Sequence, residues 1–141
     1  MRSFNRVATW FALSATCWGQ IQSAKLLAFD AHELHSFGSA VAIDDGWIIV
    51  GAIHDFDLGT ASGAAYAYQR RGAGWQFVQK FAGHDTSQSD TFGGSLALEL
   101  STCVVGAKSE FPNGVSGAGS AYVFERTGTQ WGQTQKLVAT P

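Results

Sequence analysis

After residue 19, the chain contains short apolar segments whose length and pattern are typical of β-strands. In residues 39–43 the large Val41 and Ile43 alternate with small alanines, and in residues 64–70 Tyr66 and Tyr68 fall on one side. A period of two is typical of strands. Residues 47–50 form a continuous apolar run, which indicates a strand buried on both faces. No segment after residue 19 shows the 3.6-residue periodicity of an amphipathic helix. The pattern therefore predicts an all-β protein.

Eight short strands are expected, in two sets of four that follow the same order. The first set is residues 39–43, 47–50, 64–70 and 75–81, and the second is residues 95–98, 102–105, 120–126 and 131–138. Glycines are frequent between these segments, and the chain has 17 of them among 141 residues, which is more than the average share. Glycine-rich connections between short strands indicate tight turns.

The two sets of strands are copies of one repeat. Several landmarks recur at an offset of 55 or 56 residues: Phe37-Gly38 as Phe92-Gly93, Val50-Gly51-Ala52 as Val105-Gly106-Ala107, Ala65-Tyr66 as Ala121-Tyr122, Trp75 as Trp131, and Lys25 as Lys80 and then Lys136. The offset grows from 55 to 56 between the Val-Gly-Ala and Ala-Tyr landmarks, as one residue inserted in a surface loop would cause. A constant offset over so many landmarks indicates an internal repeat.

Four antiparallel strands in a repeat of this length, rich in glycine and aromatic residues, are typical of a β-propeller blade. We therefore expect two four-stranded antiparallel blades, at residues 37–91 and 92–141, after a lead-in at residues 20–36. Residues 25–29 match the end of a fourth strand, so the lead-in is expected to carry a lone outer strand of a preceding blade. Two blades make an incomplete ring, because propellers close with about four to eight.

The repeats also resemble a known family. FGSAVAI, WIIVGA and GAAYAY in the first copy, with FGGSLAL, CVVGA and GSAYVF in the second, are similar to FG-GAP repeats, which form the blades of integrin α-chain propellers. They are closest to the bacterial variety of the repeat. The resemblance implies an extracytoplasmic propeller with a role in cell adhesion or ligand binding, and it implies no catalysis.

Residues 1–19 are expected to be a signal peptide. Arg2 and Arg6 form a short positive segment, and residues 7–19 follow without a charge. This layout is typical of a secretory signal, and a run of that length is too short to cross a bilayer. Cleavage is expected after Gly19 or after Cys17, which also raises the alternative of a lipoprotein signal; a buried N-terminal helix is the structural alternative. No other stretch is apolar enough for a membrane span, so the mature chain is expected to be soluble, and the signal predicts a secreted or extracytoplasmic protein.

The net charge argues against a nucleic-acid partner, and the cysteine content argues against an internal disulfide. The net charge of the chain is −2, and loss of Arg2 and Arg6 with the signal would leave 7 basic and 11 acidic residues. Such a balance gives no electrostatic basis for binding nucleic acid. Loss of Cys17 would leave Cys103 alone, so no internal disulfide is expected. Cys103 aligns with the apolar Ile48, which predicts a buried thiol without a catalytic role.

The family resemblance implies a calcium loop after the Val-Gly-Ala landmark. In the first repeat Asp55, Asp57 and Gly59 follow the alternate spacing of such a loop, which is one acidic ligand short. The second loop, residues 108–114, has no Asp pair and contains Lys108. Calcium is therefore a candidate cofactor at the first loop, and the alternative is that both loops are solvated turns.

A second pair of loops precedes each Phe-Gly landmark. His32, Glu33 and His35 offer zinc-type ligands in one copy only, and a solvated loop is the alternative that we favour. Asp30 and Asp85 are equivalent in the two copies, which favours a repeated structural role such as an Asx turn. No acid–base pair or nucleophile is visible in either repeat, so we expect no enzyme activity.

Function and assembly stay open at this stage. The leading hypothesis is a secreted or cell-surface binding or adhesion module with a protein or glycan ligand. The alternative is a non-binding structural region of a larger exported enzyme or adhesin. Aromatic or acidic residues exposed at equivalent loops would favour binding. For the incomplete ring three explanations are open: the chain is part of a longer propeller, several chains self-assemble into a ring, or two sheets form an open stack.

Overall fold

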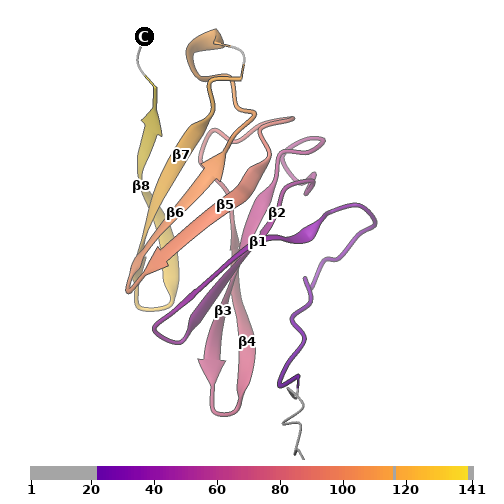
Figure 1. Ribbon diagram of the computed structural model, residues 1–141, viewed down its shortest axis with the longest axis vertical. Helices are drawn as coiled ribbons and strands as arrows, with labels where there is room; N and C mark the ends of the chain where they lie inside the picture. Colours follow the sequence, from indigo (N-terminus) through magenta and orange to yellow (C-terminus); the bar gives the residue numbers. More distant parts are fainter. Residues whose placement is uncertain (1–21, 116, 140–141) are drawn as a thin grey trace, which may run out of the picture.

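The computed structural model describes residues 22–115 and 117–139 and consists of two four-stranded sheets (Figure 1). The strands of the first sheet are β1 (Phe37–Asp44), β2 (Trp47–Ala52), β3 (Ala64–Arg71) and β4 (Gly74–Phe81). Those of the second are β5 (Phe92–Glu99), β6 (Thr102–Ala107), β7 (Ser120–Thr127) and β8 (Gln130–Val138), with one short helix, η1 (Pro112–Gly114). The prediction of an all-β fold is confirmed, and the signal peptide predicted at residues 1–19 lies outside the described residues.

Each sheet is an antiparallel meander with its strands in chain order. The register is the same in both: Phe37 pairs with Ala52 and Phe92 with Ala107, and each first strand then shifts register before its next pair. A second shift interrupts the pairing of β3 with β4 and of β7 with β8 at equivalent places. The sequence repeat is therefore a structural repeat down to its irregularities. The strands extend one to three residues beyond several of the predicted bounds.

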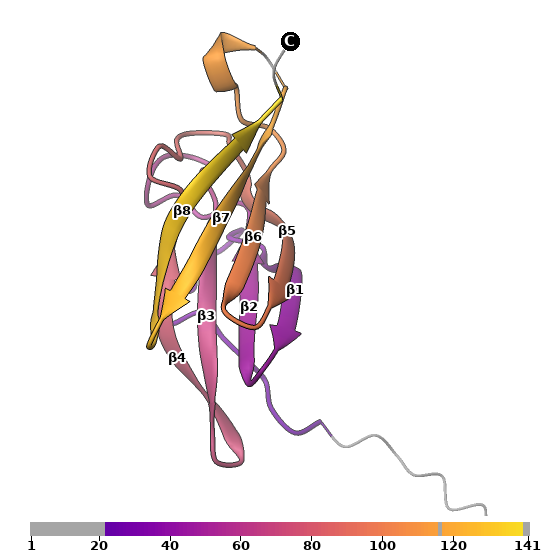
Figure 2. The ribbon, with the colours of Figure 1, turned by 90° about the vertical axis from the view of Figure 1, so that its left-hand side faces the viewer.

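The two sheets pack face to face as neighbouring blades do (Figure 2). The first strands, β1 and β5, lie side by side, and β4 contacts β8 at the other margin. Between the sheets lies the larger hydrophobic core, to which the first blade contributes Trp47, Ile49 and Phe81 and the second contributes mainly aromatic residues: Phe92, Tyr122, Phe124 and Trp131. Cys103 is fully buried in this core, as predicted, and burial raises its pKa to about 12. A buried thiol with a raised pKa stays protonated and contributes to packing.

Two glycines let the backbones of the blades touch. A Cβ atom on Gly51 would lie 2.0 Å from the carbonyl oxygen of Gly93. Gly93 itself has a φ of +89°, and a Cβ there would lie 2.6 Å from the carbonyl oxygen of Ala64. Contacts that short are excluded between real atoms, so only glycine fits at either position. The Phe-Gly and Val-Gly-Ala landmarks thus meet at the line where one blade joins the next.

Side-chain amides and carboxylates add fixed points to this interface. Gln79 on β4 both donates to the carbonyl oxygen of Trp131, at 2.9 Å, and accepts from its N–H, at 2.7 Å. Asp44 accepts a hydrogen bond of 2.6 Å from the N–H of Leu100. The Arg126 guanidinium lies over the ring of Trp47, 4.8 Å from its centroid. These contacts set the relative position of the sheets beyond what apolar packing specifies.

The lead-in differs from its prediction. Residues 22–28 form no strand, so the prediction of a lone outer strand at residues 25–29 was wrong. An outer strand needs a neighbour to pair with, and no strand of a preceding blade is present among the described residues. The segment instead crosses the free face of the first blade, where Leu26 and Ala28 join the smaller core around Tyr66 and Tyr68. The Tyr68 hydroxyl donates to the carbonyl oxygen of Leu27 at 2.8 Å.

The far face of the second blade is open to solvent. The face of the first blade that carries Ile49, Ala65, Ala67 and Phe81 is buried against the second blade. The equivalent residues of the second blade, Val104, Ala121, Val123 and Leu137, are all partly or largely exposed, and Leu137 is 50% exposed. Gln135, which is equivalent to Gln79, is also exposed. This surface is called the open face below.

Substituting Gly51 with alanine tests the backbone contact between blades. We expect Gly51→Ala to lower the free energy of unfolding by at least about 2 kcal/mol, because the new methyl group overlaps backbone that side-chain motion cannot clear. Gly132→Ala is the control, since a Cβ at that exposed position meets no heavy atom within 4 Å. Urea denaturation of both variants is the measurement. Equal midpoints for the two would contradict the contact.

Candidate functional site

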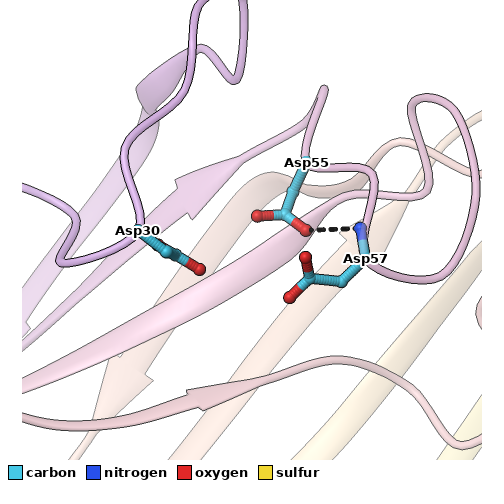
Figure 3. A group of neighbouring side chains, drawn as sticks. All are labelled: Asp30, Asp55 and Asp57. Carbon is cyan, nitrogen blue, oxygen red and sulfur yellow. Dashed lines mark hydrogen bonds between the residues drawn. The ribbon is translucent and has the colours of Figure 1, made fainter.

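The loop after β2 turns back on a buried carboxylate. Asp55 is only 1% exposed. Its Oδ1 accepts a hydrogen bond of 3.1 Å from the N–H of Asp57, which closes an Asx turn (Figure 3). Its backbone oxygen accepts from the Ser62 hydroxyl at 3.0 Å. The remaining carboxylate oxygen, Oδ2, points away from the turn and toward the sheet. A buried charge of this kind requires a cation and hydrogen-bond donors.

Lys80 supplies the cation. This residue lies near the end of β4, and its ammonium group contacts three carboxylates: Asp30 at 2.7 Å, Asp55 at 2.7 Å and Asp57 at 2.5 Å. An ammonium has three N–H donors, so one donor is available for each carboxylate. The lysine thereby joins three separate segments, namely the lead-in, the loop after β2 and the outer strand. Its side chain is only 15% exposed.

Tyr66, on β3, is the fifth residue of the cluster. Its hydroxyl on β3 lies 2.9 Å from Oδ1 of Asp30 and 2.9 Å from Oδ2 of Asp55, so its one proton is shared between two carboxylates. The Lys80 ammonium lies 5.3 Å from the centroid of the same ring, which adds a cation–π contact. Tyr66 is fully buried and Asp57 is exposed, so the cluster is shielded from water at the tyrosine and open to solvent at Asp57.

The charges in the cluster stabilise one another. Burial alone would raise the pKa of Asp30, but hydrogen bonds from Lys80 and Tyr66 outweigh it and hold that pKa below its ordinary value. Burial alone would lower the pKa of Lys80, but its carboxylate partners raise it above the ordinary value. Burial raises the pKa of Tyr66, and the hydrogen bond to Asp55 raises it further. The ammonium, the carboxylate of Asp30 and the neutral phenol are therefore the stable forms at neutral pH.

The second blade repeats this arrangement. The Tyr122 hydroxyl lies 2.9 Å from Oδ1 of Asp85 and 2.8 Å from Oε2 of Glu110. Lys136 contacts both carboxylates, with 2.5 Å to Asp85, and lies 5.2 Å from the centroid of the Tyr122 ring. Each residue is the repeat equivalent of its counterpart in the first blade, and Pro112 replaces Asp57. We call the two arrangements the first and second lysine clusters.

The first lysine cluster has the ligand type and spacing that suit a cation. Oxygen atoms of Asp30, Asp55 and Asp57 lie within 4.8 Å of one another. Carboxylates at that spacing suit a metal ion, and calcium prefers oxygen ligands of this kind. The cation between them, however, is the Lys80 ammonium. A calcium ion would need the same carboxylate oxygens that the ammonium already contacts, so it does not fit at this place beside the lysine.

The structure places the other candidate residues as follows. Gly59, with a φ of +123°, closes the turn that begins at Phe56, and Asp30 is the third carboxylate of the cluster in addition to Asp55 and Asp57. Asp30 and Asp85 have equivalent structural roles in the two blades; each is the partner of a tyrosine and a lysine, whereas the example given from the sequence was an Asx turn. His35 is buried, so a wholly solvated loop was the wrong prediction: its Nδ1 lies 3.6 Å from Asp55, and its ring packs edge-on against Phe56. His32 and Glu33 are exposed.

Sequence reasoning missed the lysines and tyrosines as members of a site. Lys80, Lys136, Tyr66 and Tyr122 were visible only as landmarks of the repeat. A usable signal existed, because these residues recur at the repeat offset of 56 residues. Asp30 recurs as Asp85, and Asp55 as Glu110, at the offset of 55 that applies before the one-residue insertion. Polar residues that keep such an offset amid varied loops indicate a shared role.

One family match is found for this chain. The profile of the family described as FG-GAP repeat matches residues 18–68 and 75–124, which is more than half of the chain. Each match contains one set of the Phe-Gly, Val-Gly-Ala and Ala-Tyr landmarks, and each begins before its Phe-Gly landmark, so the matches are shifted toward the N-terminus relative to the two copies defined above. No curated protein matches the chain significantly. Within the described residues, no helix is long and apolar enough to cross a membrane.

The acid limb of the stability curve tests the second lysine cluster. The hydrogen bond from Lys136 holds the pKa of Asp85 below its ordinary value of 3.8. The stability it contributes is therefore present above pH 3.8 and lost as pH falls through the lower pKa of the folded state. We expect Asp85→Asn to cost about 1 kcal/mol at pH 7, because the pair is partly exposed, and to cost progressively less below pH 3.8.

Urea denaturation at pH 7 and pH 3 measures this difference. Glu99→Gln is the control, since Glu99 lies exposed on β5 and makes no ion pair in the described part of the chain. A cost for Asp85→Asn that stays constant with pH would contradict the assignment of the lowered pKa to this carboxylate.

Proposed function

Because the chain belongs to the FG-GAP repeat family, we propose that it is an extracytoplasmic binding module with a protein or glycan ligand. Repeats of this family build β-propeller-type modules, and the two stacked sheets described above are consistent with two such blades. The family generally serves structure and binding rather than catalysis. Export rests on the family and on the predicted signal at residues 1–19, and it stays a prediction.

The observation that carries the proposal is an aromatic residue exposed at the same place in both blades. Phe56 follows β2 and Phe111 follows β6, at the repeat offset of 55 residues. Their exposures are 47% and 50%. The loops that hold them lie at the same end of the blades, the upper end in Figure 1. The loops differ in most other residues, so a shared exposed aromatic favours a shared binding role.

Each phenylalanine lies beside a shallow depression. The first depression is lined mainly by apolar atoms and includes Leu34, His54, Phe56 and Ala61. The second includes Phe111, Pro112 and Asn113 together with polar groups of the second lysine cluster. Leu34 is 86% exposed. Apolar surface at a loop end with polar groups nearby suits a protein segment or the face of a sugar ring.

The second candidate function is a structural region of a larger exported protein, and the open face favours it. Val104, Val123 and Leu137 are the counterparts of residues that blade packing buries in the first copy. A further blade of the same type would cover them. If that blade belongs to another copy of the chain, the protein self-assembles, as the ring hypothesis requires.

The calcium site expected at Asp55, Asp57 and Gly59 is not tested by any bound ion and is not part of this proposal. The spacing of the carboxylates supports a cation site, and the family resemblance supports calcium. The position of the Lys80 ammonium counts against it, because the ion and the lysine would compete for the same oxygens.

Binding assays on loop variants test the leading proposal. The probes are immobilised extracellular-matrix proteins and polysaccharides, tested with the full chain and with the double variant Phe56→Ser/Phe111→Ser. We expect the double variant to lose at least about 90% of the binding to any probe that the unaltered chain retains, since exposed aromatic anchors dominate interface energies. Leu137→Ser, on the open face, is the control. Unchanged binding by the loop variant, or loss only in the control, would reject this surface.

Sedimentation velocity at rising protein concentration tests self-assembly through the open face. We expect the full chain to associate at concentrations of tens of micromolar, and Leu137→Asp to remain monomeric because it places a charge in the contact. A monomer of the unaltered chain at every concentration would reject self-assembly and leave the further blade to another polypeptide segment.

A further inference from the structure

The geometry points to Lys80 as a built-in cation that takes the position of a calcium ion, so that this FG-GAP blade is held together without metal. The inference concerns the first lysine cluster and does not depend on the proposed ligand surface. It rests on the positions of one ammonium group, three carboxylates and one tyrosine, and on their partial repetition in the second blade.

The Lys80 ammonium is in contact with all three carboxylates. It donates hydrogen bonds to Asp30 and Asp57 and forms an ion pair with Asp55, and the contact distances are 2.5 to 2.7 Å. The oxygens that would have to converge on a metal ion are already turned toward the ammonium. Asp55 Oδ1 is engaged by the N–H of Asp57, and its Oδ2 also accepts from Tyr66. A metal ion can reach these oxygens only if Lys80 leaves.

The second blade supports the same reading independently. Lys136 contacts Asp85 and Glu110 in the equivalent position, although that loop has Pro112 in place of Asp57. The lysine is therefore retained where the third carboxylate is absent. A residue that served only to balance the charge of the Asp55–Asp57 pair would have no reason to recur there.

The lead-in shows what the cation does. Asp30 comes from the segment before β1, and Lys80 and Tyr66 hold its carboxylate against the sheet. Asp85 in the loop before β5 is held in the same way. The lysine thus joins the outer strand of a blade to the segment that enters the blade and to the loop after its second strand.

Removing the lysine should expose the cation site. The full chain is titrated with calcium chloride and followed by calorimetry and by thermal unfolding, with magnesium chloride in parallel. We expect no calcium heat and no calcium-dependent shift of Tm for the unaltered chain. Lys80→Ala should bind calcium at least about tenfold more tightly than the detection limit set by the unaltered chain, because a positive charge in contact with the ligands is removed. Its Tm should then rise with calcium concentration.

Lys136→Ala is the matched control within the same chain. It loses an equivalent ammonium but leaves two carboxylates, so it should be destabilised without gaining calcium affinity. Lys80→Arg should stay insensitive to calcium, because a cation remains in the cluster. Calcium that restores a folded state to an otherwise unfolded Lys80→Ala would support the inference.

Two results would overturn it. One is calcium binding by the unaltered chain that is as tight as binding by Lys80→Ala. The other is a folded Lys80→Ala that gains no calcium response. If Lys80→Ala does not fold with or without calcium, the titration of the unaltered chain decides alone, since binding there would show that the ion and Lys80 do not compete.

Discussion

A buried carboxylate and the lysine that neutralises it hold each blade together. Asp55 and Glu110 lie at equivalent points of the two loops, where water cannot solvate their charge. Lys80 and Lys136 reach them from the outer strands, and Tyr66 and Tyr122 approach from the third strands. Because one charge cannot stay buried without the other, loop, outer strand and entering segment have to be in place together. The blade is therefore specified by a polar cluster as well as by its core.

The blades join through contacts of a different kind. Gly51 and Gly93 bring backbone against backbone, and aromatic residues fill the space between the sheets. In the described residues this backbone contact is made once, between the first blade and the second, although each blade carries both landmarks. The lead-in covers part of the free face at one side, while the open face at the other side presents Val104, Val123 and Leu137 without a cover in the described part of the chain. Association is the expected use of such a face.

Repetition made the architecture predictable from the sequence. Phe37-Gly38 and Phe92-Gly93 fixed the period, and the alternating runs placed the strands to within a few residues. The cluster was harder to foresee, because Lys80 lies about fifty residues after Asp30 and no local pattern connects them. The burial of His35 depended on Phe56 folding over it, which is a tertiary contact. The lone strand at residues 25–29 was not observed, since pairing depends on a neighbour that a sequence pattern cannot supply.

The ammonium groups of Lys80 and Lys136 are held inside carboxylate clusters. Nuclear magnetic resonance of the lysine side-chain nitrogens at neutral pH, without added metal, measures whether they are bound or solvated. We expect two ammonium signals that exchange slowly with water, the first lost in Lys80→Arg and the second in Lys136→Arg. Signals that exchange as fast as those of free lysine would contradict this arrangement, because such ammonium groups would be solvated rather than bound.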